Sequence, residues 1–314
     1  CATVAKVTLP ELKRRGYDEK LTIGTIAGSG TLGLLIPPSI IMIVYGVAAD
    51  VSITRLFVAG IIPGLLMIAL FMSFVAIWSI LNPNKVPQKD PAISFIQKIK
   101  ASGSLIPVTL LIIGIMGSIY LGIASPTDSA AVGVVLSLIL VWLYGDLNWQ
   151  SFKAGLFSAM LTSSMIAFIL AGAAFLTVAM GYSNIPMLLA QWITELGLNH
   201  YALIAVLALF FVIMGCFLDG ISIVVLTTSI LLPSIQAAGI DPLWFGLFLV
   251  LVVEMAQITP PVGLNLFVLQ GMTGKHIWYL SLATLPFFLM LLLGVILITV
   301  FPEIVMFLPK MMYS

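Results

Sequence analysis

Long apolar stretches alternate with short polar segments along the whole chain. A helix needs about 20 apolar residues to cross a bilayer. By this measure we predict membrane-crossing helices at residues 21–46, 56–81, 104–123, 128–145, 152–181, 243–270 and 277–301. A further apolar stretch, 201–235, is interrupted by Asp219-Gly220, which predicts a helical hairpin with a polar tip. Residues 185–197 are short and amphipathic, and we expect them to lie at a membrane interface.

The composition indicates that lipid covers much of the molecule. The chain is 61% hydrophobic and 8% charged, with a mean hydropathy of +1.21, whereas soluble domains are about 45–50% apolar and about 25% charged. The net charge of +1 gives no indication of nucleic-acid binding. Two cysteines and two distant histidines provide neither a disulfide framework nor a metal-ligand spacing. We predict an all-α integral membrane protein in contact with lipid, and not an enzyme.

The basic residues predict how the chain is oriented. Lysine and arginine concentrate on the cytoplasmic side of membrane proteins. In the predicted arrangement, all 13 except Arg55 and Lys310 fall on one side, mostly in segments 1–20 and 82–100. The chain starts at Cys1 without a signal peptide, so we expect it to begin inside a longer polypeptide.

A sequence repeat relates the two ends of the chain. A shift of about 223 residues, without gaps, aligns a pattern of Leu-Pro, Gly, Asp and Pro-Pro. It superimposes Leu9-Pro10 on Leu232-Pro233, Gly16 on Gly239, Asp18 on Asp241 and Pro37-Pro38 on Pro260-Pro261. Five predicted crossings separate the copies, which predicts an inverted repeat, an architecture typical of transporters. The first hairpin would lie mostly before Cys1, so it is incomplete in this chain.

The two Pro-Pro pairs predict broken membrane helices. Proline removes a helical hydrogen bond, and unpaired carbonyls in hydrocarbon must be satisfied by protein, water or an ion. The carbonyls, with Ser39 and Thr259, are oxygen ligands that suit Na⁺. The alternative is a proline kink satisfied by neighbouring helices. Glycines 28, 30 and 33 would allow another backbone to approach closely.

Polar residues inside predicted spans are further candidates. Asp219 could bind the ion, cap a helix or contact water. Glu254 could be a proton or ion site, or a partner of the broken backbone. Asp128 is expected to cap a helix. The candidates for substrate contact are Asn265, Ser222, Thr227 and Thr228.

Several motifs together resemble the DctM-like large membrane subunit of TRAP (tripartite ATP-independent periplasmic) transporters. They are GTIAGSGTLGLLIPPSIIMIVYG, AGIIPG, SPTDSAAVG, GCFLDG, GIDPLWFG and ITPPVGLNLFV. In detail the chain is most similar to the sialic-acid permeases.

This resemblance implies an elevator-type fold, with hairpins and broken helices moving against a scaffold in the bacterial inner membrane. It divides the chain into a first transport repeat (1–50), scaffold and connecting helices (51–200), a second transport repeat (201–272) and a C-terminal scaffold helix (273–314). The implied partners are a small four-helix membrane subunit, sometimes fused, and a periplasmic substrate-binding protein. The implied cofactor is Na⁺, and the sodium positions that the resemblance implies are Gly33, Ile36, Pro37, Ser39, Gly215, Asp219, Ala256, Thr259 and Val262.

The expected function is Na⁺-coupled symport of an organic acid, sialic acid in the closest resemblance. One alternative is a di- or tricarboxylate:Na⁺ symporter that needs no binding protein. A second, from another class, is an ion channel whose pore is formed by the broken helices. An intramembrane enzyme would need a nucleophile or metal constellation, which the sequence does not display.

Overall fold

A computed structural model describes the chain apart from residues 88–93, 95–101, 145–147, 185–186, 189–190, 192–194, 196, 262 and 313–314. In the described part every regular element is a helix, which confirms the predicted all-α class. The chain divides into two compact units, residues 1–87 with 169–314, and residues 88–168. The predicted interfacial segment 185–197 lies largely outside the described residues.

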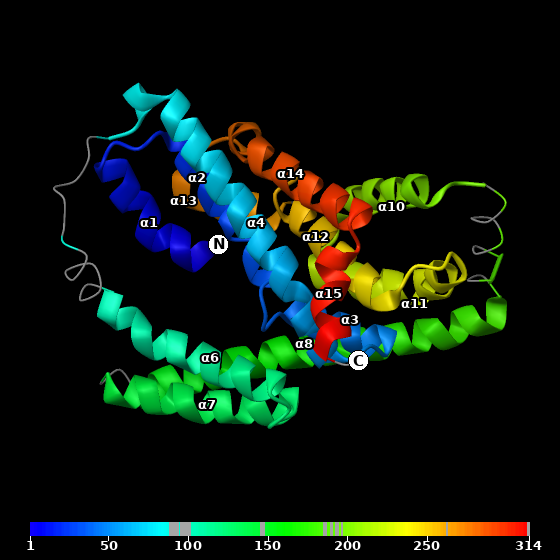
Figure 1. Cartoon of the computed structure of the whole chain (residues 1–314). Coiled ribbons are helices and arrows are strands. Elements are labelled where there is room, and N and C mark those ends of the chain that lie inside the picture. Colours follow the sequence, from blue (N-terminus) through cyan, green and yellow to red (C-terminus); the bar gives the residue numbers. More distant parts are fainter. Residues whose placement is uncertain are drawn as a thin grey trace. The chain divides into compact units, whose positions relative to one another are not determined.

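The larger unit is built around α12, which is buried along nearly its whole length. Helix α12 packs against α10, α11, α14 and α4 (Figure 1). The elements of this unit, besides the last part of α8, are α1 (Ala2–Arg14), α2 (Glu19–Ser29), η1 (Leu32–Leu34), α3 (Ile40–Ala49), α4 (Ile53–Leu81), η2 (Pro83–Lys85), α10 (His200–Gly215), α11 (Gly220–Ala237), α12 (Pro242–Gln257), α13 (Leu264–Thr273), α14 (Ile277–Val300) and α15 (Glu303–Met312).

The smaller unit contains η3 (Ser102–Leu105), α6 (Ile106–Tyr120), α7 (Pro126–Leu143) and the first part of α8 (Trp149–Ser183). Helices α6 and α7 pack together, and the hydroxyls of Ser118 and Ser129 lie 2.9 Å apart between them. Ser125 and Asp128 form a reciprocal capping box at the start of α7. The predicted capping role of Asp128 is confirmed.

Five described helices are long and apolar enough to cross a membrane, namely α4, α7, α8, α11 and α14. Four of the predicted spans correspond to α4, α7, α8 and α14. The predicted span 104–123 contains α6, which has 15 residues. The predicted hairpin is present as α10 and α11. The predicted spans 21–46 and 243–270 are each divided into two helices, as the Pro-Pro pairs indicated.

The sequence repeat is also a repeat of backbone geometry. Helices α1 and α11 both end in a Schellman motif, in which a glycine takes a left-handed conformation and two amides close back on the last turn. Gly16 has φ +78° and Gly239 has φ +73°. The closing bonds are Tyr17 N to Leu12 O and Ile240 N to Ile235 O, each 3.1 Å. The next aspartate in each copy, Asp18 or Asp241, caps the following helix.

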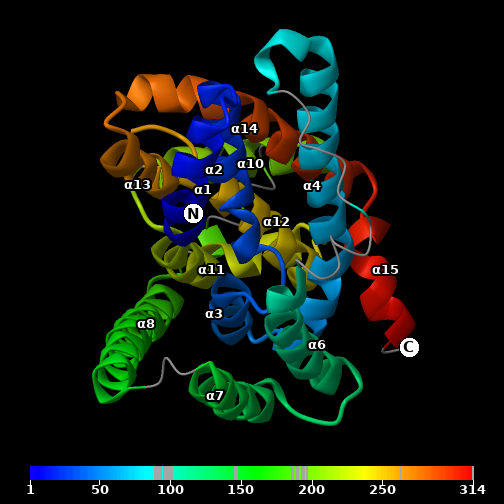
Figure 2. The same ribbon diagram turned by 90° about the vertical axis from the view of Figure 1, so that its left-hand side faces the viewer.

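Two glycines let α2 and α14 approach closely. A Cβ placed on Gly24 would lie 2.2 Å from the carbonyl oxygen of Ala283, and one on Gly28 would lie 2.6 Å from the ring of Phe287. Small residues four apart are a common membrane-helix contact, and Figure 2 shows α2 beside α14. Of the glycines predicted to allow close approach, Gly30 lies against the Cβ and Cα of Cys1, whereas a Cβ on Gly33 would meet open space.

Candidate functional site: two broken helices and a hairpin tip

The first break separates α2 from α3. An uninterrupted helix would cap the carbonyls of Gly33 and Leu34 with the amides four residues later, but those residues are Pro37 and Pro38, which have none. The hydroxyl of Ser39 donates to the Leu34 carbonyl and accepts from the Met42 amide at 3.4 Å. No helical donor is available for the carbonyl of Gly33, which lies at an exposed position.

The second break repeats this arrangement between α12 and α13. Here Pro260 and Pro261 remove the amides that would cap Ala256 and Gln257. The chain compensates in part, because the Thr259 amide donates to Ala256 O at 3.2 Å. The Thr259 hydroxyl donates to Met255 O at 2.6 Å. Since that bond uses its only proton, the oxygen of Thr259 keeps lone pairs with which it can accept a cation.

The tip of the hairpin between α10 and α11 is organised by Asp219. Its carboxylate accepts the amides of Ile221 at 3.1 Å and Ser222 at 3.2 Å, and the Ser222 hydroxyl at 2.5 Å. Of the three roles considered for Asp219, the structure contains the helix cap. The remaining carboxylate lone pairs face an exposed surface, so capping does not prevent contact with an ion.

A small cavity lies where the hairpin tip meets the end of α12. Its volume is about 20 Å³, and its walls are formed by Gly215, Leu218, Asp219, Gly220, Val253, Ala256, Gln257 and Leu264. One water needs about 10–15 Å³, so the cavity has room for one water or one small ion. Most of these walls are apolar, and the Asp219 carboxylate and the Gln257 side chain are the polar side chains among them.

The two breaks belong to one structural centre. The amide of Asn265, on α13, donates to Ala27 O of α2 at 3.3 Å. Glu254 of α12 is completely buried and lies near the Thr31 side chain and the Leu35 backbone of the first break. Neither of its carboxylate oxygens has a hydrogen-bond partner among the described residues.

The structure brings together part of the predicted cation set. Gly215, Asp219 and Ala256 share the small cavity, and Thr259 follows it at the second break. The residues from the first break, Gly33, Ile36, Pro37 and Ser39, are neighbours of one another but do not line that cavity. Val262 lies outside the described residues. The role of each as a ligand stays a prediction.

The predicted substrate residues are distributed over two elements. Ser222 is bound to Asp219 at the hairpin tip, and Asn265 bridges to α2. Thr227 and Thr228 are buried within α11, where the Thr227 hydroxyl donates to Ile223 O at 2.7 Å. The Thr228 hydroxyl has no partner in the described part of the chain. Contact of these four residues with substrate stays a prediction.

Sequence reasoning did not single out several residues of this centre. The side chain of Gln257 lines the small cavity, and Thr31 faces Glu254. A signal for both exists in the sequence, because each is a polar residue within an apolar run next to a break. Val253 and Leu264 line the cavity through tertiary packing, for which a single sequence offers no signal.

The comparisons with known proteins agree with this architecture. A family profile described as "Tripartite ATP-independent periplasmic transporter, DctM component" matches residues 1–304. The C4-dicarboxylate TRAP transporter large permease protein of Pseudomonas aeruginosa is 34% identical over 98% of this chain and 72% of its own length. The protein of the same name from Rhodobacter capsulatus is 32% identical, covering 98% and 73%. The isethionate TRAP transporter permease protein of Oleidesulfovibrio alaskensis is 32% identical over 98% of this chain and 48% of its own length.

The relatives are named as transporter permeases and not as enzymes. With several apolar helices, the protein is a multi-pass protein of the bacterial inner membrane. Because the profile covers nearly the whole chain and the first two relatives match over more than two thirds of their length, the chain belongs to the DctM family, the large membrane permease of tripartite ATP-independent periplasmic transporters.

Proposed function

We propose that this permease imports a small organic acid by symport with Na⁺, and that Na⁺ binds at the broken helices. The observation that carries the proposal is the paired break. Two Pro-Pro sequences, at equivalent positions of a structural repeat, remove the helical donors of four backbone carbonyls. In the described part of the chain, only those of Leu34 and Ala256 regain a donor, from Ser39 and Thr259. Such carbonyls are stable inside a membrane only when protein, water or an ion satisfies them.

The small cavity beside the second break supports the same proposal. It has the volume of one water or ion and is lined by Gly215, Asp219 and Ala256. Cation binding there would join the hairpin tip to the end of α12. That coupling provides a reason for substrate and Na⁺ to move together, with the hairpins and broken helices moving as one body in an elevator motion.

The substrate is proposed at the level of an organic anion. The relatives' names give C4-dicarboxylate and isethionate, and the motif resemblance favours sialic acid. All three carry an acidic group, and the amino ends of half-helices favour anions. Ser222, Thr227, Thr228 and Asn265 are the proposed contacts. We further propose a small membrane subunit and a periplasmic binding protein as partners, in keeping with the tripartite family.

The experiment is uptake into proteoliposomes that contain this permease and its two partners. C4-dicarboxylates, isethionate and sialic acid are compared with and without an inward Na⁺ gradient. Uptake that requires both the gradient and the binding protein supports the proposal. Uptake independent of Na⁺ contradicts it. Uptake without the binding protein indicates the symporter that needs no binding protein. A flux faster than an alternating-access cycle allows indicates a channel.

A further inference from the structure

A second cavity lies away from the broken helices, at the opposite ends of α2 and α13. Its volume is about 610 Å³, and its lining includes Leu9, Lys13, Glu19, Ile23, Met272 and Lys275. Cavities of about 300–1,000 Å³ are typical of small-molecule sites. The basic residues mark this end as cytoplasmic. The 11 residues of α2 separate it from the first break by about 16 Å.

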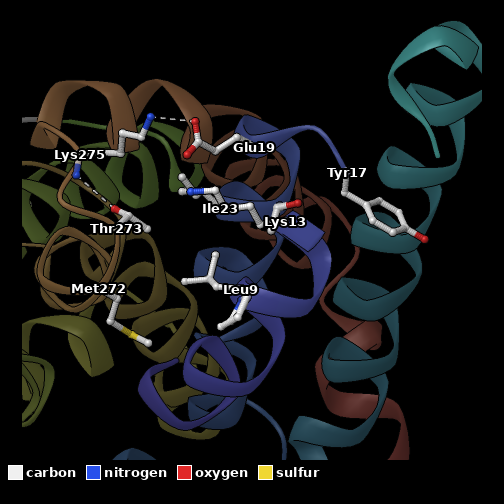
Figure 3. Close-up of a pocket in the computed structure, with 10 residues that line it drawn as sticks. Leu9, Lys13, Tyr17, Glu19, Ile23, Met272, Thr273 and Lys275 are labelled. Carbon is white, nitrogen blue, oxygen red and sulfur yellow. Dashed lines mark hydrogen bonds and ion pairs between the residues drawn. The ribbon is translucent and has the colours of Figure 1, made fainter. Parts of the chain in front are cut away.

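The polar side of this cavity contains an ion pair in which another anion can replace the carboxylate. Lys275 Nζ lies 2.9 Å from a Glu19 oxygen (Figure 3). The Tyr279 hydroxyl also donates to Glu19, at 3.1 Å. The pair joins the start of α2 to the segment between α13 and α14. Both charged side chains are about 40% exposed, and ion pairs this exposed contribute only about 0–1 kcal/mol. A second anion can therefore compete with Glu19 for Lys275.

Lys13 provides a second positive charge at this cavity. It lines the cavity from α1 and has no ion pair in the described part of the chain, whereas its neighbours Arg14 and Arg15 both pair with Glu11. Lys13 is near enough to Glu19 to contribute to lowering the pKa of that carboxyl, after the larger effect of Lys275. The opposite wall is apolar, formed by Leu9, Ile23 and Met272, while the Tyr17 ring points away from these side chains (Figure 3).

We propose that this cavity binds a small organic anion from the cytoplasm, with Lys13 and Lys275 holding its acidic group and the apolar wall its carbon chain. The bound anion takes Lys275 from Glu19 and so breaks the tie between α2 and the segment between α13 and α14. If the anion is the transported acid, which rests on the proposed function, its accumulation inside the cell slows further import.

The binding test uses the purified permease with its small subunit, in detergent without Na⁺. Succinate is titrated by calorimetry into the wild type, Lys13→Gln and Lys6→Gln. Lys6 lies on the same helix but does not line the cavity, so Lys6→Gln is the matched control. We expect Lys13→Gln to bind about tenfold more weakly, because it loses a charge-assisted contact, and Lys6→Gln to bind like the wild type. Lys275→Gln repeats the test should Lys13→Gln not purify.

Equal succinate affinity in wild type and both cavity variants would overturn the proposal. So would binding of phosphatidylglycerol with this lysine dependence but no binding of succinate, because the site would then be one for a lipid headgroup. A second assay measures uptake into proteoliposomes preloaded with succinate. Preloading should slow the wild type and Lys6→Gln but not Lys13→Gln. Calorimetric binding without any Na⁺-driven uptake would preserve the cavity as an anion site and refute only the proposed function.

Discussion

Gly215 and Ala256 lie so close that a Cβ on Gly215 would stand 2.1 Å from the Cβ of Ala256. The first residue ends one arm of the hairpin and the second lies in the last turn of α12. Their contact forms part of the wall of the small cavity. The absence of one side chain thus sets how closely the hairpin tip can approach the second break.

Gly215→Ala is expected to destabilise the protein, because the added methyl group overlaps a buried neighbour. Overpacking of this kind costs about 1–3 kcal/mol. Ala256→Gly removes the methyl group with which the new Cβ overlaps. The double variant Gly215→Ala/Ala256→Gly should therefore recover most of the lost thermal stability. Gly271→Ala is the control, since a Cβ there meets open space. A double variant no more stable than Gly215→Ala would show that the contact is not the cause.

Thr259→Ala should weaken the dependence of uptake on Na⁺. The hydroxyl oxygen at the second break retains free lone pairs, and its loss is expected to raise the half-saturating Na⁺ concentration about tenfold, the effect of about 1.4 kcal/mol. Thr259→Ser should behave like the wild type. Thr177→Ala removes a hydroxyl that also donates to a carbonyl of its own helix, and serves as control. An unchanged Na⁺ dependence would exclude Thr259 as a ligand.

Glu254→Gln should preserve the thermal stability of the purified protein. A buried carboxylate without a partner is costly as an anion, so a neutral amide of the same shape is expected to be tolerated. Glu254→Ala should lose about 2–4 kcal/mol, because truncation of a large buried side chain leaves a cavity. If Glu254→Gln is as destabilising as Glu254→Ala, this expectation is wrong. The carboxyl group would then stabilise the protein through an interaction that an amide cannot make.

The Glu19–Lys275 pair should make stability depend weakly on acid pH. The hydrogen bond from Lys275 lowers the pKa of Glu19 below its ordinary value of 4.5. A lowered carboxyl pKa contributes stability above 4.5 that is lost as the pH falls through the folded-state pKa. The unfolding temperature of Glu19→Gln should therefore lie below that of the wild type at neutral pH, and the difference should vanish in acid. A difference that stays constant with pH would contradict this assignment.

The breaks and the repeated turns could be predicted because single residue types determine them. Tandem prolines cannot continue a helix, and Gly16 and Gly239 adopt the left-handed conformation that ends one. The aspartates that follow have the side chain a helix start prefers. In each case the cause lies within a few residues of the effect.

Other features depend on partners distant in sequence and were not predictable. The carboxylate of Glu254, which has no hydrogen-bond partner among the described residues, faces Thr31, more than 200 residues earlier. The last predicted span ends at residue 301. The structure contains a further helix, α15, which follows Pro302 and packs against α4 (Figure 2). The hairpin contact between Gly215 and Ala256 is likewise set by tertiary packing, which hydropathy does not record.

The narrowness of the cavity at the hairpin tip has a consequence for selectivity. A space of about 20 Å³ holds one water, so the proposed Na⁺ would enter it only after losing its hydration shell. The protein oxygens must then replace that shell at fixed distances. At such a site a divalent ion such as Mg²⁺, which gives up its water reluctantly, would be disfavoured by the cost of dehydration, before any ligand distinguishes it from Na⁺.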